Sequence, residues 1–98
     1  MATAGALAEL EGIIREWDAR LAEMRRRSLE MSEADAARHQ PHLRTLAAKV
    51  ETLRSRWDDR GLSPILAPEV VARIRAAKED LETTFAAVAP SLSPLLPR

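Results

Sequence analysis

A row of apolar residues spaced alternately three and four positions apart occupies the first third of the chain. The spacing places its members along one side of an α-helix, and it is typical of coiled-coil packing. The row consists of Leu7, Leu10, Ile14, Trp17, Leu21, Met24, Ser28 and Met31, with Ser28 as its only polar member. Acids precede bases by four positions around it, as in Glu16 and Arg20, which is the favourable order in a helix. The pattern predicts a first helix over about residues 4–30.

A second row with the same spacing follows a short turn at residues 31–33. Ser32 is suited to cap a new helix, and Gly61 is suited to the left-handed conformation that ends one. The row consists of Leu43, Leu46, Val50, Leu53 and Trp57. Pro41 either kinks this helix or begins it anew, because proline lacks a backbone donor and clashes with the carbonyl group four residues earlier. We expect a second helix over about residues 34–60 with an irregularity near Pro41.

A third helix is predicted over about residues 69–89. Pro68 is well placed at its start, and Pro90 stops it. Its apolar stripe is wider than contact with a single helix requires, which indicates burial against two neighbours. The stripe consists of Val70, Val71, Ile74, Ala77, Leu81, Phe85 and Val88.

The C-terminal tail, residues 90–98, combines three prolines with three leucines. Prolines this closely spaced are expected to prevent any helix. We therefore predict an extended tail, which either lies along a groove or is disordered.

The short turn at residues 31–33 favours an antiparallel arrangement of the first two helices. The sequence therefore predicts an all-α fold in a single domain, residues 1–98. In this fold a long antiparallel helical hairpin and a third helix form a coiled-coil-like three-helix bundle. Trp17 and Trp57 are expected to be buried in opposite halves of the hairpin.

Composition narrows the range of partners. The chain has 15 basic and 15 acidic residues, a formal net charge of +0, and no cysteine. Balanced charge argues against a nucleic-acid partner, and the absence of cysteine fits a reducing cytosol. No stretch approaches the roughly 20 apolar residues of a membrane-spanning helix. We expect a cytoplasmic protein with no membrane association.

Two groups of polar residues are candidate sites. His39 and His42 could be two metal ligands on one helix face, but no third ligand lies at a recognisable spacing. Arg25, Arg26 and Arg27 form the only run of like charge, yet they fan around a helix and lack aromatic neighbours for nucleic-acid stacking. Nucleophile–base pairs and phosphate-binding loops are not recognisable. We therefore expect no catalytic, cofactor or metal site.

The function favoured by these patterns is that of a non-enzymatic helical interaction protein, such as a scaffold, a small chaperone or an assembly component. Ile13 and Leu29 are apolar but lie off the main row, and we expect such surplus surface to be used in a homodimer. The alternative is a small regulatory binder of nucleic acid or metal that uses Arg25–Arg27 or His39 and His42.

Overall fold

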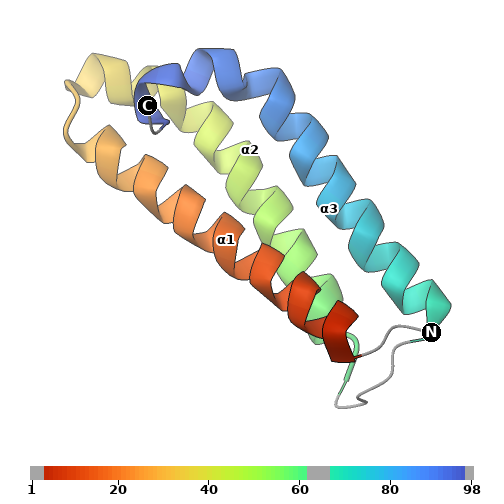
Figure 1. Ribbon diagram of the computed structural model, residues 1–98. Helices are drawn as coiled ribbons and strands as arrows, with labels where there is room; N and C mark the ends of the chain where they lie inside the picture. The colour runs from red at the N-terminus through yellow and green to blue at the C-terminus, as the bar shows by residue number, and fades with distance from the viewer. Residues whose placement is uncertain (1–3, 62–66, 97–98) are drawn as a thin grey trace.

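The protein is a bundle of three α-helices followed by a short 3₁₀-helix, as seen in the computed structural model of residues 4–61 and 67–96 (Figure 1). The helices are α1 (Ala4–Leu29), α2 (Glu33–Asp58) and α3 (Pro68–Val88), and the 3₁₀-helix is η1 (Ala89–Leu95). No strand occurs among these residues. The predicted all-α three-helix bundle is confirmed.

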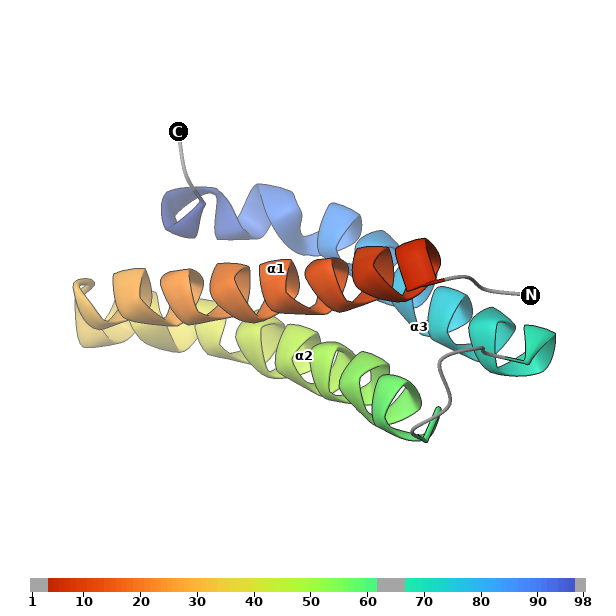
Figure 2. The same ribbon diagram turned by 60° about the horizontal axis from the view of Figure 1, so that its bottom comes forward.

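The middle helix, α2, is the one on which the others pack. Both α1 and α3 run antiparallel to α2 and lie against it along its length (Figures 1 and 2). By contrast, over the described residues no Cα atom of α1 lies within 8 Å of a Cα atom of α3. The two outer helices are therefore joined through α2 and through side chains rather than by close backbone contact.

The ends of the helices follow from local sequence signals. The Asp35 backbone amide donates to Ser32 Oγ at 3.2 Å, so Ser32 is the N-cap of α2 as predicted. Gly61 follows the last turn of α2 with a φ of 74°, a left-handed conformation that residues with a side chain rarely adopt. Pro68 is the first residue of α3, where its fixed φ fits a helix and its missing donor is not needed.

Pro41 does not interrupt α2. The helix is continuous from Glu33 to Asp58 with Pro41 inside it, so a restart at this proline does not occur. Pro41 is exposed and cannot donate to the Ala37 carbonyl, which removes one hydrogen bond from the solvent side of the helix. The buried side chains of His39 and Leu43 flank this position and keep both turns packed against the bundle.

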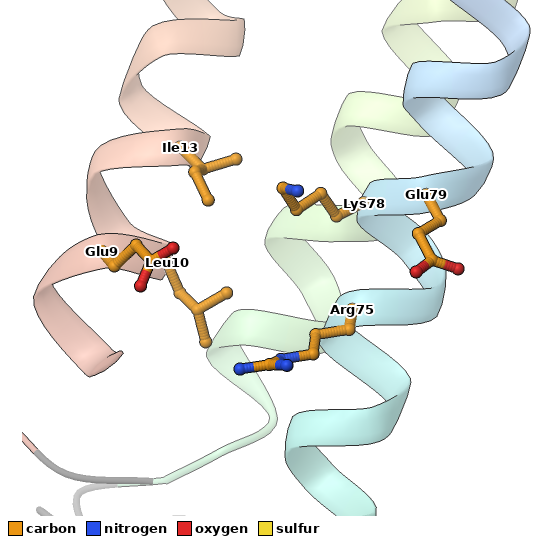
Figure 3. A pocket seen from close by; sticks show the side chains of 6 residues that line it. All are labelled: Glu9, Leu10, Ile13, Arg75, Lys78 and Glu79. Carbon is orange, nitrogen blue, oxygen red and sulfur yellow. The ribbon is translucent and has the colours of Figure 1, made fainter.

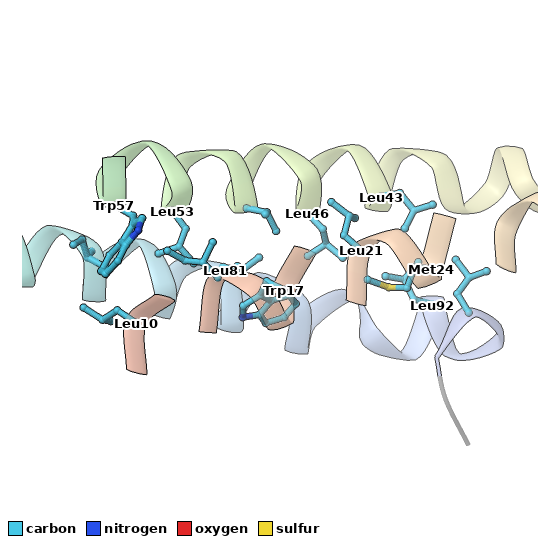
Figure 4. Packing of buried hydrophobic residues seen from close by; sticks show 14 residues of the cluster. Leu10, Trp17, Leu21, Met24, Leu43, Leu46, Leu53, Trp57, Leu81 and Leu92 are labelled. Atoms are coloured by element: carbon cyan, nitrogen blue, oxygen red, sulfur yellow. The ribbon is translucent and has the colours of Figure 1, made fainter. Parts of the chain in front are cut away.

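The core consists of apolar side chains from all four elements. Leu46, Leu53, Ile74, Leu81, Leu92 and Leu95 are buried almost completely. The exposed fractions of Trp17 and Trp57 are only 5% and 8%, so the predicted burial of both is confirmed. Figure 4 shows Trp57 and Leu10 toward one end of the core, and Met24, Leu43 and Leu92 toward the other.

The C-terminal segment corrects the prediction of an extended tail. Residues 89–95 form the 3₁₀-helix η1, which contacts α1, α2 and α3, and its Leu92 and Leu95 side chains have no exposed surface. A 3₁₀-helix tolerates Pro90 and Pro94 because the φ of proline lies within its normal range. The segment docks on its own bundle, and residues 97–98 lie outside the described part of the chain.

Replacement of Leu46 by aspartate is expected to unfold the protein. Leu46 has no exposed surface, and a carboxylate there would have no partner, at a cost of several kcal/mol against a total stability of about 5–15 kcal/mol. The matched control is Leu29→Asp, because Leu29 is 86% exposed. Circular dichroism melts should show a lost transition for Leu46→Asp and a nearly unchanged one for Leu29→Asp, and similar effects would contradict the assigned core.

The docking of η1 predicts that Leu92→Ala lowers stability by about 2–5 kcal/mol, the usual cost of truncating a fully buried leucine. Ser93→Ala, one residue further on and exposed, should change stability little. Urea denaturation of both variants would measure the difference. Equal midpoints for Leu92→Ala and the unmodified protein would mean that η1 is not held against the bundle in solution.

Candidate functional site

Two hollows lie between α1 and α3, along the groove that separates these helices. The first has a volume of about 200 Å³ and lies between the N-terminal half of α1 and the middle of α3. Figure 3 shows Leu10 and Ile13 pointing from α1 toward α3, while Arg75 and Lys78 extend from α3 toward α1. Charged side chains from both helices, Glu9 on α1 and Arg75, Lys78 and Glu79 on α3, make up most of the lining of this hollow.

The second hollow lies further along the same groove and has a volume of about 520 Å³. Its apolar lining comes from three elements, with Met24 from α1, Phe85 from α3, and Leu95 and Leu96 at the C-terminal end. Glu16, Ala19, Arg20 and Glu23 of α1 line the rest. Because η1 is docked, its leucines extend the apolar floor that α1 and α3 begin.

Trp17 and Phe85 join α1 to α3 across the groove. Their rings meet edge to face, with centroids 5.2 Å apart and planes at 76°. The Arg20 guanidinium lies 5.0 Å from the centroid of the Trp17 ring, a cation–π contact. The aromatic contact links the two outer helices across the groove. The groove is therefore part of the packed structure.

A second row on α1, also spaced alternately four and three positions apart, borders the groove. It consists of Glu9, Ile13, Glu16, Arg20, Glu23 and Arg27. Within it Arg20 donates to Glu16 at 2.6 Å, and Arg27 donates to Glu23 at 2.8 Å. From Glu16 to Arg27 this edge of α1 therefore alternates in charge, while Ile13, its one apolar member, lies between two acids, Glu9 and Glu16.

Glu23 and Arg26 are the titratable groups with the clearest perturbation among the described residues. Hydrogen bonds from Arg26 and Arg27 lower the pKa of Glu23 from the usual 4.5 to about 2. The same contacts, chiefly the hydrogen bond to Glu23, raise the pKa of the Arg26 guanidinium. Arg27 Nη1 also donates to the Leu96 carbonyl at 2.9 Å, so this ion-pair cluster ties the end of the C-terminal segment to α1.

The arginine run does not act as one group. Arg26 bonds to Glu23 and Glu30, and Arg27 bonds to Glu23 and the Leu96 carbonyl. Within residues 4–61 and 67–96, no ion pair or hydrogen bond involves the Arg25 side chain, which points to a different hollow, lined by α1 and α2. The interpretation of Arg25–Arg27 as a single nucleic-acid contact thus loses its geometric basis.

His39 and His42 are brought together at the hairpin end of the bundle. With Asp35 and Arg38 they line a hollow of about 620 Å³, whose other side is formed by Ser91 and Ser93 of η1. His39 is buried and His42 is half-buried, while Asp35 is paired with Arg38 at 3.0 Å. Among the described residues, no group of three His, Asp or Glu side chains is arranged to hold a metal ion.

The groove itself was not predicted from the sequence. The wide stripe of α3 predicts burial against two neighbours, but only Ile74 and Leu81 of it are fully buried, and among the described residues the backbone neighbours of α3 are α2 and η1 rather than α1. The charged row on α1 does not signal a groove, because acids and bases four positions apart also occur on solvated helix faces. The Trp17–Phe85 contact was missed because residues far apart in sequence carry no local pattern.

Comparison of the chain with known protein families, curated proteins and solved structures gave no match. Among the described residues, no helix has both the length and the apolar character that crossing a membrane requires.

The low pKa of Glu23 predicts a specific pH dependence of stability. A carboxyl with a lowered pKa in the folded state stabilises the fold fully above its unfolded value near 4.5 and loses this contribution as the pH falls to about 2. Glu23→Gln cannot ionise, so it should melt at a lower temperature than the unmodified protein at neutral pH. The two melting temperatures should converge near pH 2, and a difference that persists there would exclude the charge of Glu23 as its cause.

Proposed function

We propose that the protein is a non-enzymatic interaction protein, an assembly component whose contact surface is the α1/α3 groove, and that a second copy of the chain occupies this groove. The proposal rests on one observation, the row of alternating charge on α1 along an apolar groove. A surface of this kind suits another helix, because apolar side chains provide contact area while charges select the partner and its direction.

The order of charges in this row is self-complementary. If two copies of α1 cross antiparallel about a two-fold axis at residue 18, Glu9 faces Arg27 of the other copy, and Glu16 faces Arg20. The axis repeats each pair, so four pairs of opposite charge form with no like charges opposed, while Ile13 faces Glu23 of the other copy. Two-fold pairing requires such a surface, since the same patch must fit itself. A parallel pairing would instead place identical residues opposite each other.

The groove also offers apolar surface to the second copy. Ile13 is half-buried at the first hollow, and Met24, Phe85, Leu95 and Leu96 line the second. Met24 and Leu95 are already buried, so contact with the other α1 would remove mainly Phe85 and Leu96 from water, which favours association by about 25 cal/mol per Å² of apolar surface. Leu29, the other apolar residue off the main row of α1, lies outside the groove and takes no part in the proposed dimer contact.

The test is sedimentation equilibrium from low micromolar to hundred-micromolar concentration. The unmodified protein should form a dimer, and Arg20→Glu should weaken it by at least about tenfold, because like charges then face each other at the interface. Arg15→Glu is the matched control. Arg15 also pairs with an acid four residues earlier, Glu11, but it does not line the groove.

A monomer throughout this range would reject the second copy as the occupant of the groove. Equal weakening by Arg15→Glu and Arg20→Glu would show that loss of an ion pair within the helix, rather than the groove, causes the effect. Melting curves of both variants would confirm that each is folded before its association is compared.

A further inference from the structure

A separate hollow on the opposite side of α1 has the composition of a binding site for an anionic peptide. It has a volume of about 270 Å³ and lies at the hairpin end, between α1 and α2. Its lining is Arg25, Ser28 and Leu29 from α1, and Gln40, Leu43 and Arg44 from α2. None of these residues lines the α1/α3 groove, so the two surfaces are independent.

Ser28 provides the space. It is the only polar member of the first apolar row, and it is buried with 7% of its surface exposed. The members on either side of it in the row, Met24 and Met31, are large. A small side chain at a position that faces a neighbouring helix leaves room that leucine or methionine would fill. The exception in the apolar row thus coincides with a hollow in the structure.

Arg25 and Arg44 supply unneutralised positive charge. Over the described residues, neither side chain forms an ion pair or a hydrogen bond, and no acidic residue lines the hollow. The sequence explains this, because neither arginine has an acid three or four positions away on its helix. Arg15, Arg20 and Arg26, by contrast, each have such a neighbour and are paired with it.

Leu29 supplies an apolar contact beside the two arginines. It is 86% exposed and is the only large apolar residue in the described structure with such exposure. Leu43 forms part of the floor, and the Gln40 amide adds a polar group that can donate or accept a hydrogen bond. The surface therefore combines two cations with an aliphatic edge in one hollow.

We propose that this hollow binds a peptide segment in which an anionic side chain, a carboxylate or a phosphate, lies next to an aliphatic one. Two guanidinium groups from different helices can each donate to the anionic oxygens, and charge-assisted bonds of this type are stronger than neutral ones. The aliphatic neighbour packs on Leu29. No bond is made or broken, so the site is one of recognition.

The proposal is tested by nuclear magnetic resonance titration of the full chain with short capped peptides at low ionic strength. The probes are Ac-Leu-Glu-NH₂ and Ac-Leu-phosphoserine-NH₂, with Ac-Leu-Gln-NH₂ as the neutral control and inorganic phosphate as the anion without an aliphatic group. Saturable amide shifts around Arg25 and Arg44 are expected for the anionic peptides, with affinity about tenfold higher than for the neutral one. The ratio between the two anionic peptides identifies the preferred anion.

Three variants connect these shifts to the hollow. The double variant Arg25→Gln/Arg44→Gln should lose the preference for anionic peptides, and Ser28→Leu should weaken binding by filling the space without any change of charge. Arg56→Gln is the matched control, an exposed arginine of α2 outside the hollow, and it should bind as the unmodified protein does.

Four results would overturn the proposal. The first two are amide shifts as large with the neutral peptide as with the anionic ones, and an affinity for inorganic phosphate equal to that for the anionic peptides. The other two are a loss of peptide binding in Arg56→Gln as large as in the double variant, and shifts confined to the α1/α3 groove. Because the hollow lies outside that groove, the result is independent of whether the protein dimerises. Melting curves of the variants establish that each retains its fold.

Discussion

Burial of the apolar row of α2 is the interaction on which the rest of the structure depends. This row, from Leu43 to Trp57, is covered by α1 on one side and by α3 on the other. Each large apolar side chain removed from water contributes roughly 1.5–3 kcal/mol, and the outer helices have no extensive backbone contact with each other to replace it. The bundle thus consists of two helical pairs that share α2. The aromatic contact between Trp17 and Phe85 links the two outer helices.

The packing of both α1 and α3 on α2 affects the structure at the hairpin end of the bundle and along its side. At the hairpin end, η1 follows α3, contacts all three helices, and places Leu92 and Leu95 in the core. Along the side, the distance between α1 and α3 leaves a groove with an apolar floor. Both functional proposals concern α1, which presents one edge to the groove and another, around Ser28, to the opposite hollow.

Much of the fold could be predicted because its determinants are local. The three helices begin and end within a few residues of the predicted positions, since Ser32, Gly61 and Pro68 act through their own backbone geometry. The C-terminal segment was predicted wrongly as extended. Its prolines do exclude a long α-helix, but a single 3₁₀ segment needs few backbone donors, and burial of its leucines decides the outcome.

The candidate sites depend on spacing between elements, which sequence periodicity does not specify. The roles of Arg25, Arg26 and Arg27 separate only when the acids and the neighbouring helix around each one are known. His39 and His42 do lie together, but the third ligand that a metal requires is not supplied by the described residues around them. Ser28 was noticed as an exception in the apolar row, although only the structure shows that its small size opens a hollow.

Native-state hydrogen exchange tests the central claim, that α2 is the shared core of the molecule, most directly. The method reports the free energy needed to expose each backbone amide, and the most stable unit exchanges last. The slowest amides should lie in α2 between Leu43 and Leu53, with α1 and α3 exchanging earlier through separate openings. Slowest exchange in α1 or α3, with α2 opening first, would contradict this account of the fold.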